Sequence, residues 1–95
     1  MNIPWDEIEE FFFEGMVDGW VSGREPEDVP DMPGYKQYCH KRGNLSLIDR
    51  FGTTPFGHQS GGFTVIWMTV NEITFPVWQM NFWGWYLPQA TDIVK

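Results

Sequence analysis

The chain has 95 residues, which is enough for one domain but not for two hydrophobic cores. Thirteen acidic residues against six basic ones give a formal net charge of −7 at pH 7. This balance excludes a basic footprint for nucleic acid and argues against binding to an anionic membrane surface. Apolar residues make up 42% of the chain, which is typical of a folded domain rather than a disordered one.

Residues 3–18 are predicted to form a helix. Pro4 suits the first turn, where its missing N–H leaves no hydrogen bond unmade. The apolar positions that recur every three or four residues are Trp5, Ile8, Phe12 and Met16, and this stripe is widened by Phe11 and Phe13. We expect Gly19 to end the helix in the left-handed conformation.

The rest of the chain predicts a loop and a sheet. Residues 22–34 contain three prolines and two glycines, which indicate a loop. Strands are expected in meander order at residues 35–40, 45–51, 63–70 and 75–86, with a turn at Gly43–Asn44. A short helix is expected to begin near Pro88. The predicted fold is therefore α+β: a single domain, residues 1–95, in which an N-terminal helix packs on an antiparallel sheet of three to four strands.

The last two strands lack the alternation that a sheet with one wet face should show. Alternate residues of each strand are predicted to face opposite sides of the sheet. One side of the first strand carries Phe63, Val65 and Trp67, and one side of the second carries Phe75, Val77 and Gln79; the intervening residues face the other side. One helix covers one face, so the second face needs another cover. The candidates are the 22–34 loop, a ligand and a second copy of the chain; we favour the second copy, which predicts a homodimer.

The sequence carries no strong catalytic or metal-binding motif. His40 and His58 are isolated, and the Cys39–His40 dipeptide lacks the spacing of a metal site. The glycine-rich stretch 52–62 lacks the residues of a phosphate-binding loop. We therefore expect no cofactor, no metal and no established catalytic centre.

The candidate ligand-binding residues are Asp49, Trp67, Trp78, Met80 and Asn81. Asp49 is the most informative, because it shares its strand parity with Leu45, Leu47 and Phe51, and an unpaired buried acid is costly. One interpretation is a structural acid that accepts a hydrogen bond from a backbone N–H or a tryptophan indole. The alternative is a pocket acid that orients a ligand.

The segment "PVWQMNFWG", together with "LIDRF" upstream, resembles a family of small bacterial proteins that carry a domain of unknown function. The family hallmark is close to PVWxMNYxG. Its positions here are Pro76, Val77, Trp78, Met80, Asn81, Phe82 and Gly84, with Asp49 in the preceding strand. The resemblance covers about residues 35–90 and implies the same architecture. Relatives occur alone or fused behind a helix-turn-helix domain, and the fused ones would fit an effector-binding role, although the family has no established activity. We expect no helix-turn-helix in this copy, so the resemblance does not imply DNA binding.

Three functions follow as hypotheses. The first is a non-enzymatic binding or sensing module with an aromatic-lined sheet and a small-molecule ligand. The second is a homodimeric structural or interaction protein without a ligand. The third, least favoured, is a small enzyme that uses Asp49 with His40 or His58 as acid and base.

The cellular location is predicted from the cysteine content and the N-terminus. Cys39 is the only cysteine and cannot form an intramolecular disulfide. The acidic N-terminus lacks the basic segment of a signal peptide, and no apolar run reaches the length of a membrane span. We therefore expect a cytoplasmic protein.

Overall fold

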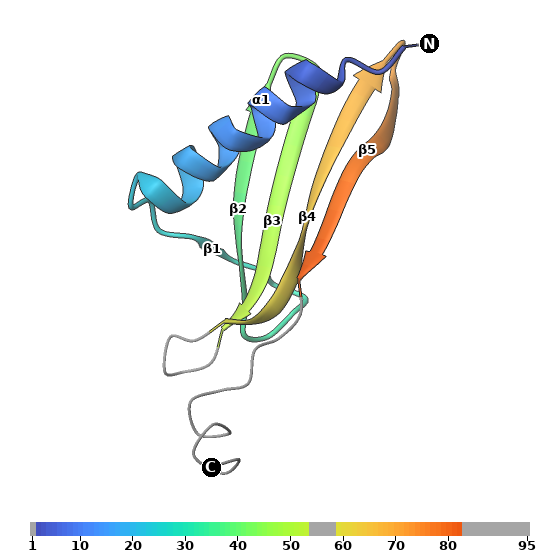
Figure 1. The fold of residues 1–95 in the computed structure, drawn as a ribbon. Coiled ribbons are helices and arrows are strands. Elements are labelled where there is room, and N and C mark those ends of the chain that lie inside the picture. The colour runs from blue at the N-terminus through green and yellow to red at the C-terminus, as the bar shows by residue number, and fades with distance from the viewer. Residues whose placement is uncertain (1, 54–58, 83–95) are drawn as a thin grey trace.

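A computed structural model describes residues 2–53 and 59–82, and the fold is given for these residues. An α-helix, α1 (Trp5–Met16), runs on into a π-helical turn, η1 (Val17–Val21). The strands that follow are β1 (Glu27–Asp28), β2 (Tyr35–Arg42), β3 (Leu45–Thr53), β4 (Gln59–Val70) and β5 (Ile73–Phe82). They form one antiparallel sheet in chain order, and α1 crosses one face of it (Figure 1). The predicted α+β class is confirmed.

The sheet of the described residues has five strands, not the three to four predicted from sequence. The additional strand, β1, lies inside the expected 22–34 loop and pairs with β2 through Glu27↔Gln37 and Asp28↔Lys36. An ion pair between Lys36 and Asp28 joins the same two strands. Two residues are too few to produce a strand periodicity, so no local pattern in the sequence indicates β1. The predicted C-terminal helix and the last part of the predicted strand 75–86 lie outside the described residues.

The prediction that Gly19 ends the helix is wrong. Gly19 lies within η1, and the first residue with positive φ after the helix is Gly23, at 79°. Gly19 is instead buried against β2, where an added Cβ would lie 2.8 Å from Cγ of Tyr38. Its role is to let the helix approach the sheet closely, a packing requirement that local sequence does not reveal.

The hairpin turns are short and explain the strand register. Gly43 has a φ of 59° at the β2–β3 turn, and Asn71 and Glu72 have φ values of 51° and 69° at the β4–β5 turn. Two consecutive positive-φ residues are typical of the type I′ turns that match the twist of a hairpin. The tight β4–β5 turn therefore places β5 directly beside β4, along the edge that faces the N-terminal half of α1 (Figure 1).

An irregularity in the β4–β5 pairing corrects the predicted strand faces. Ile66 pairs with Trp78 while the next residue, Trp67, pairs with Pro76, which leaves Val77 as an extra residue in β5. Phe75 and Trp78 consequently both pack against the core under α1, although strict alternation assigned them to opposite faces. A bulge cannot be anticipated from alternation alone, because it shifts the parity of every residue on one side of it.

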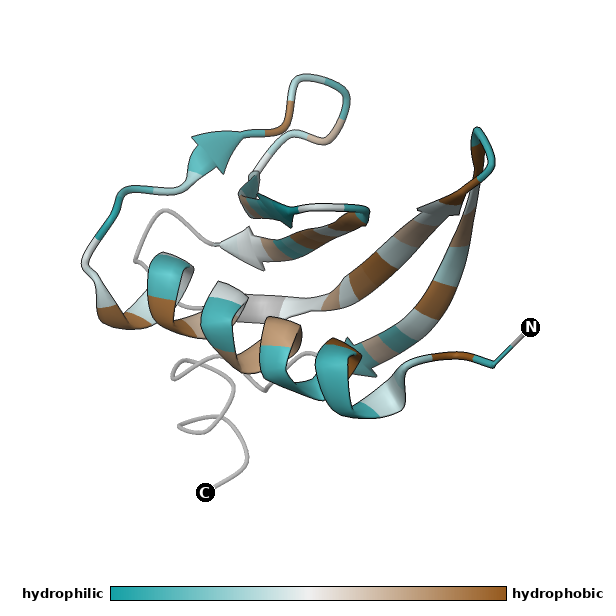
Figure 2. Cartoon of the chain, turned by 90° about the horizontal axis from the view of Figure 1, so that it is seen from above, coloured by the Kyte–Doolittle hydropathy of each residue, from teal (hydrophilic) through white to brown (hydrophobic). Residues whose placement is uncertain are grey.

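The main core lies between α1 and the centre of the sheet. Cα pairing places Leu45 beside Met68, and Leu47 beside Ile66, on the face toward the helix. The buried cluster consists of Ile8, Phe11, Leu45, Leu47, Ile66 and Met68. Figure 2 shows α1 along one side of the curved sheet, while β1 and the turn after it lie on the other side.

The second face of the sheet is covered in part by the 22–34 segment. Arg50 donates a hydrogen bond to Sδ of Met32, with Nη1 and Sδ 3.9 Å apart, and Val29 is buried. Elsewhere on that face Ile48 and Trp67 are only half-buried. Of the three predicted covers, the loop is therefore present, but only at one end of the face. Among the described residues, the remaining part of this face stays accessible.

Candidate functional site

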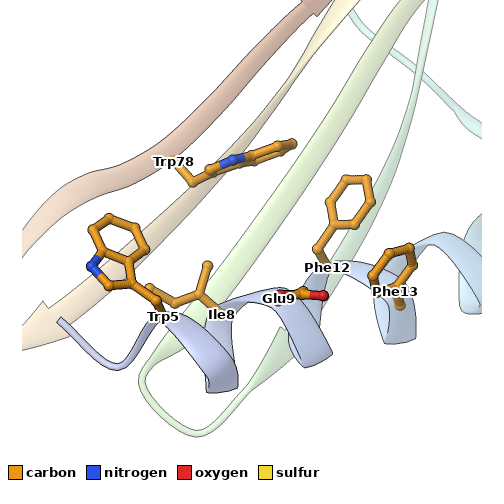
Figure 3. A pocket seen from close by; sticks show the side chains of 6 residues that line it. All are labelled: Trp5, Ile8, Glu9, Phe12, Phe13 and Trp78. Carbon is orange, nitrogen blue, oxygen red and sulfur yellow. The ribbon is translucent and has the colours of Figure 1, made fainter.

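An aromatic hollow between the N-terminal half of α1 and β5 is the principal candidate site. It has a volume of about 360 Å³ and is lined by Trp5, Ile8, Glu9, Phe12, Phe13 and Trp78. The helix supplies five of these residues, and Trp78 faces them from the sheet (Figure 3). The β5 bulge contributes to this geometry, because it directs Trp78 toward the helix alongside Phe75.

The rings of the hollow support one another. Phe12 meets the Trp78 ring edge to face with centroids 4.9 Å apart, and it meets Phe13 in the same manner at 5.2 Å. Such pairs contribute about 0.5–1.5 kcal/mol each beyond the area they bury. Two rings nevertheless remain open to solvent, since Trp5 is 56% and Phe13 57% exposed. Half of a tryptophan surface, about 100 Å², leaves about 2.5 kcal/mol of burial energy for a ligand to recover.

A second aromatic cluster surrounds Asp49 at the other end of the helix. Asp49 is 2% exposed, and its row in the sheet runs from Tyr38 through Thr64 to Met80. The indole N–H of Trp20 donates to Oδ2 of Asp49 at 2.6 Å, and the hydroxyl of Thr64 donates to Oδ1 at 3.2 Å. Burial raises the pKa of the Asp49 carboxyl, and these two hydrogen bonds oppose that rise.

Aromatic rings pack around Asp49 in this second cluster, although Trp20 itself is 39% exposed. The Trp20 ring lies 4.9 Å from that of Tyr38 and 4.7 Å from that of Phe51, measured between centroids. The guanidinium of Arg24 lies 5.6 Å from the Tyr38 ring centre. Among the described residues, every buried side-chain nitrogen or oxygen has a hydrogen-bond partner. The contacts of Asp49 therefore match the structural interpretation, an acid that accepts an indole N–H. The ligand-orienting role of Asp49 stays a prediction.

His40 joins the helix to β2, and its hydrogen bonds go to acids of the helix rather than to Asp49. Its Nε2 lies 2.8 Å from Oε2 of Glu14, and its Nδ1 lies 3.2 Å from Oδ2 of Asp18. The two acids also pair with basic side chains: Glu14 with Arg42 at 3.2 Å and Asp18 with Arg24 at 3.4 Å. The acid–base pair of the enzyme hypothesis is thus not assembled from His40, and His58 lies outside the described residues. In the described ranges, no three acids, cysteines or histidines converge on a metal-sized space.

The five predicted site residues do not share one site. Trp78 lines the hollow, and Met80 lies on the same face in the Asp49 row. Trp67 lies on the opposite face, in a hollow of about 300 Å³ that it shares with Cys39 and Ile48. Asn81 pairs with Phe63, the residue that precedes the helix-facing Thr64 in β4. The side chain of Asn81 accepts a hydrogen bond of 2.9 Å from Gln79.

The helix half of the hollow is not indicated by the apolar stripe of the sequence. Trp5, Phe12 and Phe13 were assigned to the core stripe, although Trp5 and Phe13 are mostly exposed. The run Phe11–Phe12–Phe13 is the sequence feature that indicates an aromatic side chain outside the core. Successive helix residues are turned by about 100°, so three consecutive aromatic rings cannot all face one sheet.

No family model, curated protein or solved structure matches the chain. The resemblance to the PVWxMNYxG family therefore stays a prediction. In the described part of the chain, neither the length nor the composition of any helix suits a membrane crossing. The fold and the hollow define the class of protein: a small domain in which a helix packs on a meander sheet, with an open aromatic surface at one sheet edge.

Proposed function

We propose that this protein is a non-enzymatic binding module that accepts an organic cation in the hollow between α1 and β5. The observation that carries the proposal is the composition of the lining, which includes four aromatic side chains and one charged group, the carboxylate of Glu9. The faces of aromatic rings carry negative potential and attract cations, and quaternary ammonium groups are bound in proteins by such rings. The volume, about 360 Å³, lies in the range of small-ligand sites.

The charges around the hollow support a cationic ligand. Among the described residues no basic side chain lines it, and residues 2–23 contain no lysine, arginine or histidine. Glu9 is exposed, so its carboxylate is free of the burial cost that Asp49 bears. A carboxylate or phosphate ligand would meet like charge at this edge, whereas a cation would meet opposite charge.

Choline and its uncharged carbon analogue, 3,3-dimethyl-1-butanol, form a matched pair of probes. We expect saturable quenching of tryptophan fluorescence by choline and at least fivefold weaker binding of the alcohol, because only choline carries the charge that the rings attract. Equal binding of the two probes would show that the hollow selects shape alone. No saturable binding of choline would contradict the proposal.

Two substitutions test the site, and a third serves as a control. Trp5→Ala and Glu9→Gln each remove one element of the lining and should weaken choline binding by at least fivefold. Trp67→Phe changes a tryptophan on the opposite face and should leave the affinity unchanged. A loss in all three variants alike would indicate binding elsewhere.

A homodimer is the second candidate function, favoured by the half-buried Ile48 and Trp67 on the face away from α1. Edge pairing is a weaker route to it, because β1 is two residues long and β5 carries Pro76 and a bulge, features that blunt edges. Light scattering over a hundredfold concentration range tests the dimer. A mass twice the 11.2 kDa of the chain would support it, and a constant single mass would exclude it. The cytoplasmic location likewise stays a proposal, supported by the lone cysteine.

A further inference from the structure

The hollow continues into an apolar ridge along the exposed side of the helix. Phe13, Val17 and Val21 follow one another at intervals of four residues, and they are 57%, 54% and 75% exposed. Residues four apart lie on the same side of a helix, one turn above each other. From Trp5 to Val21 the ridge spans seventeen residues, or sixteen helical steps, which corresponds to roughly 20–24 Å at the rise of a helix.

Acidic side chains border this ridge. Glu9 and Glu10 precede Phe13 by four and three residues, so they lie within one turn of it, and both are exposed. Asp6 precedes Phe13 by seven residues and falls on the same side. The acids on the opposite side are already engaged, since Glu14 and Asp18 contact His40 and two arginines.

The combination of an apolar ridge and an acidic border limits which partners could cover the ridge. A second copy docked helix to helix would oppose two sets of carboxylates, and an anionic membrane surface would be repelled in the same way. A small organic cation fills the hollow but cannot reach from Trp5 to Val21. A basic amphipathic segment of another protein meets both requirements, with apolar side chains on the ridge and lysine or arginine beside the acids.

We propose that the hollow and the ridge together are a docking surface for a basic amphipathic helical segment of a partner protein. The inference rests on the proposed function, because it assigns the organic cation of the hollow to a lysine or arginine side chain of that segment. The hollow receives the cationic side chain, and the ridge carries the apolar stripe of the same segment.

The probe is a synthetic 17-residue peptide of leucine and lysine with leucine at helical spacing, titrated into the full chain by calorimetry. A scrambled peptide of the same composition is the control for plain charge attraction. We expect the patterned peptide to bind at least tenfold more tightly than the scrambled one. Affinities within twofold of each other would overturn the proposal, since the net charge of −7 alone would then explain binding.

Charge variants locate the contact. The double substitution Glu9→Gln with Glu10→Gln should weaken peptide binding about three- to tenfold, the range for two exposed charge contacts. Glu7→Gln with Glu25→Gln removes the same net charge at exposed positions away from the ridge and should change the affinity less than twofold. Equal losses in the two double variants would overturn the assignment to this surface.

A ridge variant separates this inference from the proposed function. Val17→Ser with Val21→Ser should weaken the peptide at least fivefold and leave choline binding intact, because neither valine lines the hollow. If choline binds and the peptide shows no preference for the ridge, only the docking surface fails. If neither binds, both proposals fail. A doubled mass in light scattering that disappears in the ridge variant would assign the surface to a second copy and would also overturn the docking surface.

Discussion

The two ends of the helix carry aromatic clusters of similar composition that differ in what closes them. At the C-terminal end, Trp20 donates its indole N–H to Asp49, and the rings of Tyr38 and Phe51 pack around the pair. At the N-terminal end, Trp5 and Phe13 stand more than half exposed beside Trp78. Aromatic content is shared by both ends, so it does not distinguish a binding surface from a core. The distinguishing features are the degree of exposure, 39% for Trp20 against 56% for Trp5, and the hydrogen bond that Trp20 makes to a buried acid; both depend on tertiary contacts.

The largest expected effect is on the closed cluster. Trp20→Ala removes the donor to Asp49 and the contacts with Tyr38 and Phe51, so we expect the free energy of unfolding to fall by about 3 kcal/mol. Trp5→Ala is the matched control and should cost less, about 1–2 kcal/mol, because more than half of the Trp5 surface is in water. Urea unfolding measures both. Equal costs would abolish the distinction between the two ends.

A smaller effect is expected at the glycine that brings the helix onto β2. Gly19→Ala places a Cβ 2.8 Å from Tyr38, and we expect a loss of about 1–2 kcal/mol after the helix preference of alanine is allowed for. Val17→Ala, on the exposed side of the same turn, should change stability by less than about 0.5 kcal/mol. Thermal unfolding compares the two. A stabilised Gly19→Ala protein would contradict the close packing at this end.

The smallest effect concerns the charge of Asp49. Its folded-state pKa is raised by burial, so its contribution to stability is fully present below the unfolded value near 3.8 and is lost as the pH rises through the folded value. Asp49→Asn keeps the shape: its amide oxygen can accept the indole N–H of Trp20, and its NH₂ can donate to the hydroxyl oxygen of Thr64. We therefore expect a change at pH 7 of less than about 1 kcal/mol and a flatter dependence of stability on pH.

Urea unfolding at pH 3 and pH 7 tests this, with Asp31→Asn at an exposed position as the control. Relative to the unsubstituted chain, the Asp49→Asn variant should gain stability as the pH rises from 3 to 7. The control should follow the unsubstituted chain. A loss relative to the unsubstituted chain over the same range would mean that the ionised carboxylate stabilises the fold.

The order of the elements could be predicted from the sequence, and the site could not. The apolar stripe, the prolines of the loop and the alternating strands led to a helix on a meander sheet, because these signals are local. The bulge at Val77, the two-residue β1 and the packing role of Gly19 arise from contacts between distant segments. The sequence indicates Trp78 as a candidate, but its stripe pattern places the helix partners of Trp78 in the core. Which side of a wide stripe is buried depends on how the helix lies across the sheet.

Indole N–H signals of ¹⁵N-labelled protein, followed by NMR during a choline titration, test the central claim most directly. The six tryptophans give separate reporters in one sample, and single Trp→Phe variants assign them. We predict saturable shifts of the Trp5 and Trp78 signals, with those of Trp20 and Trp67 unchanged. Shifts confined to Trp20, or no saturable shift at Trp5 and Trp78, would contradict a binding surface at the open end of the helix.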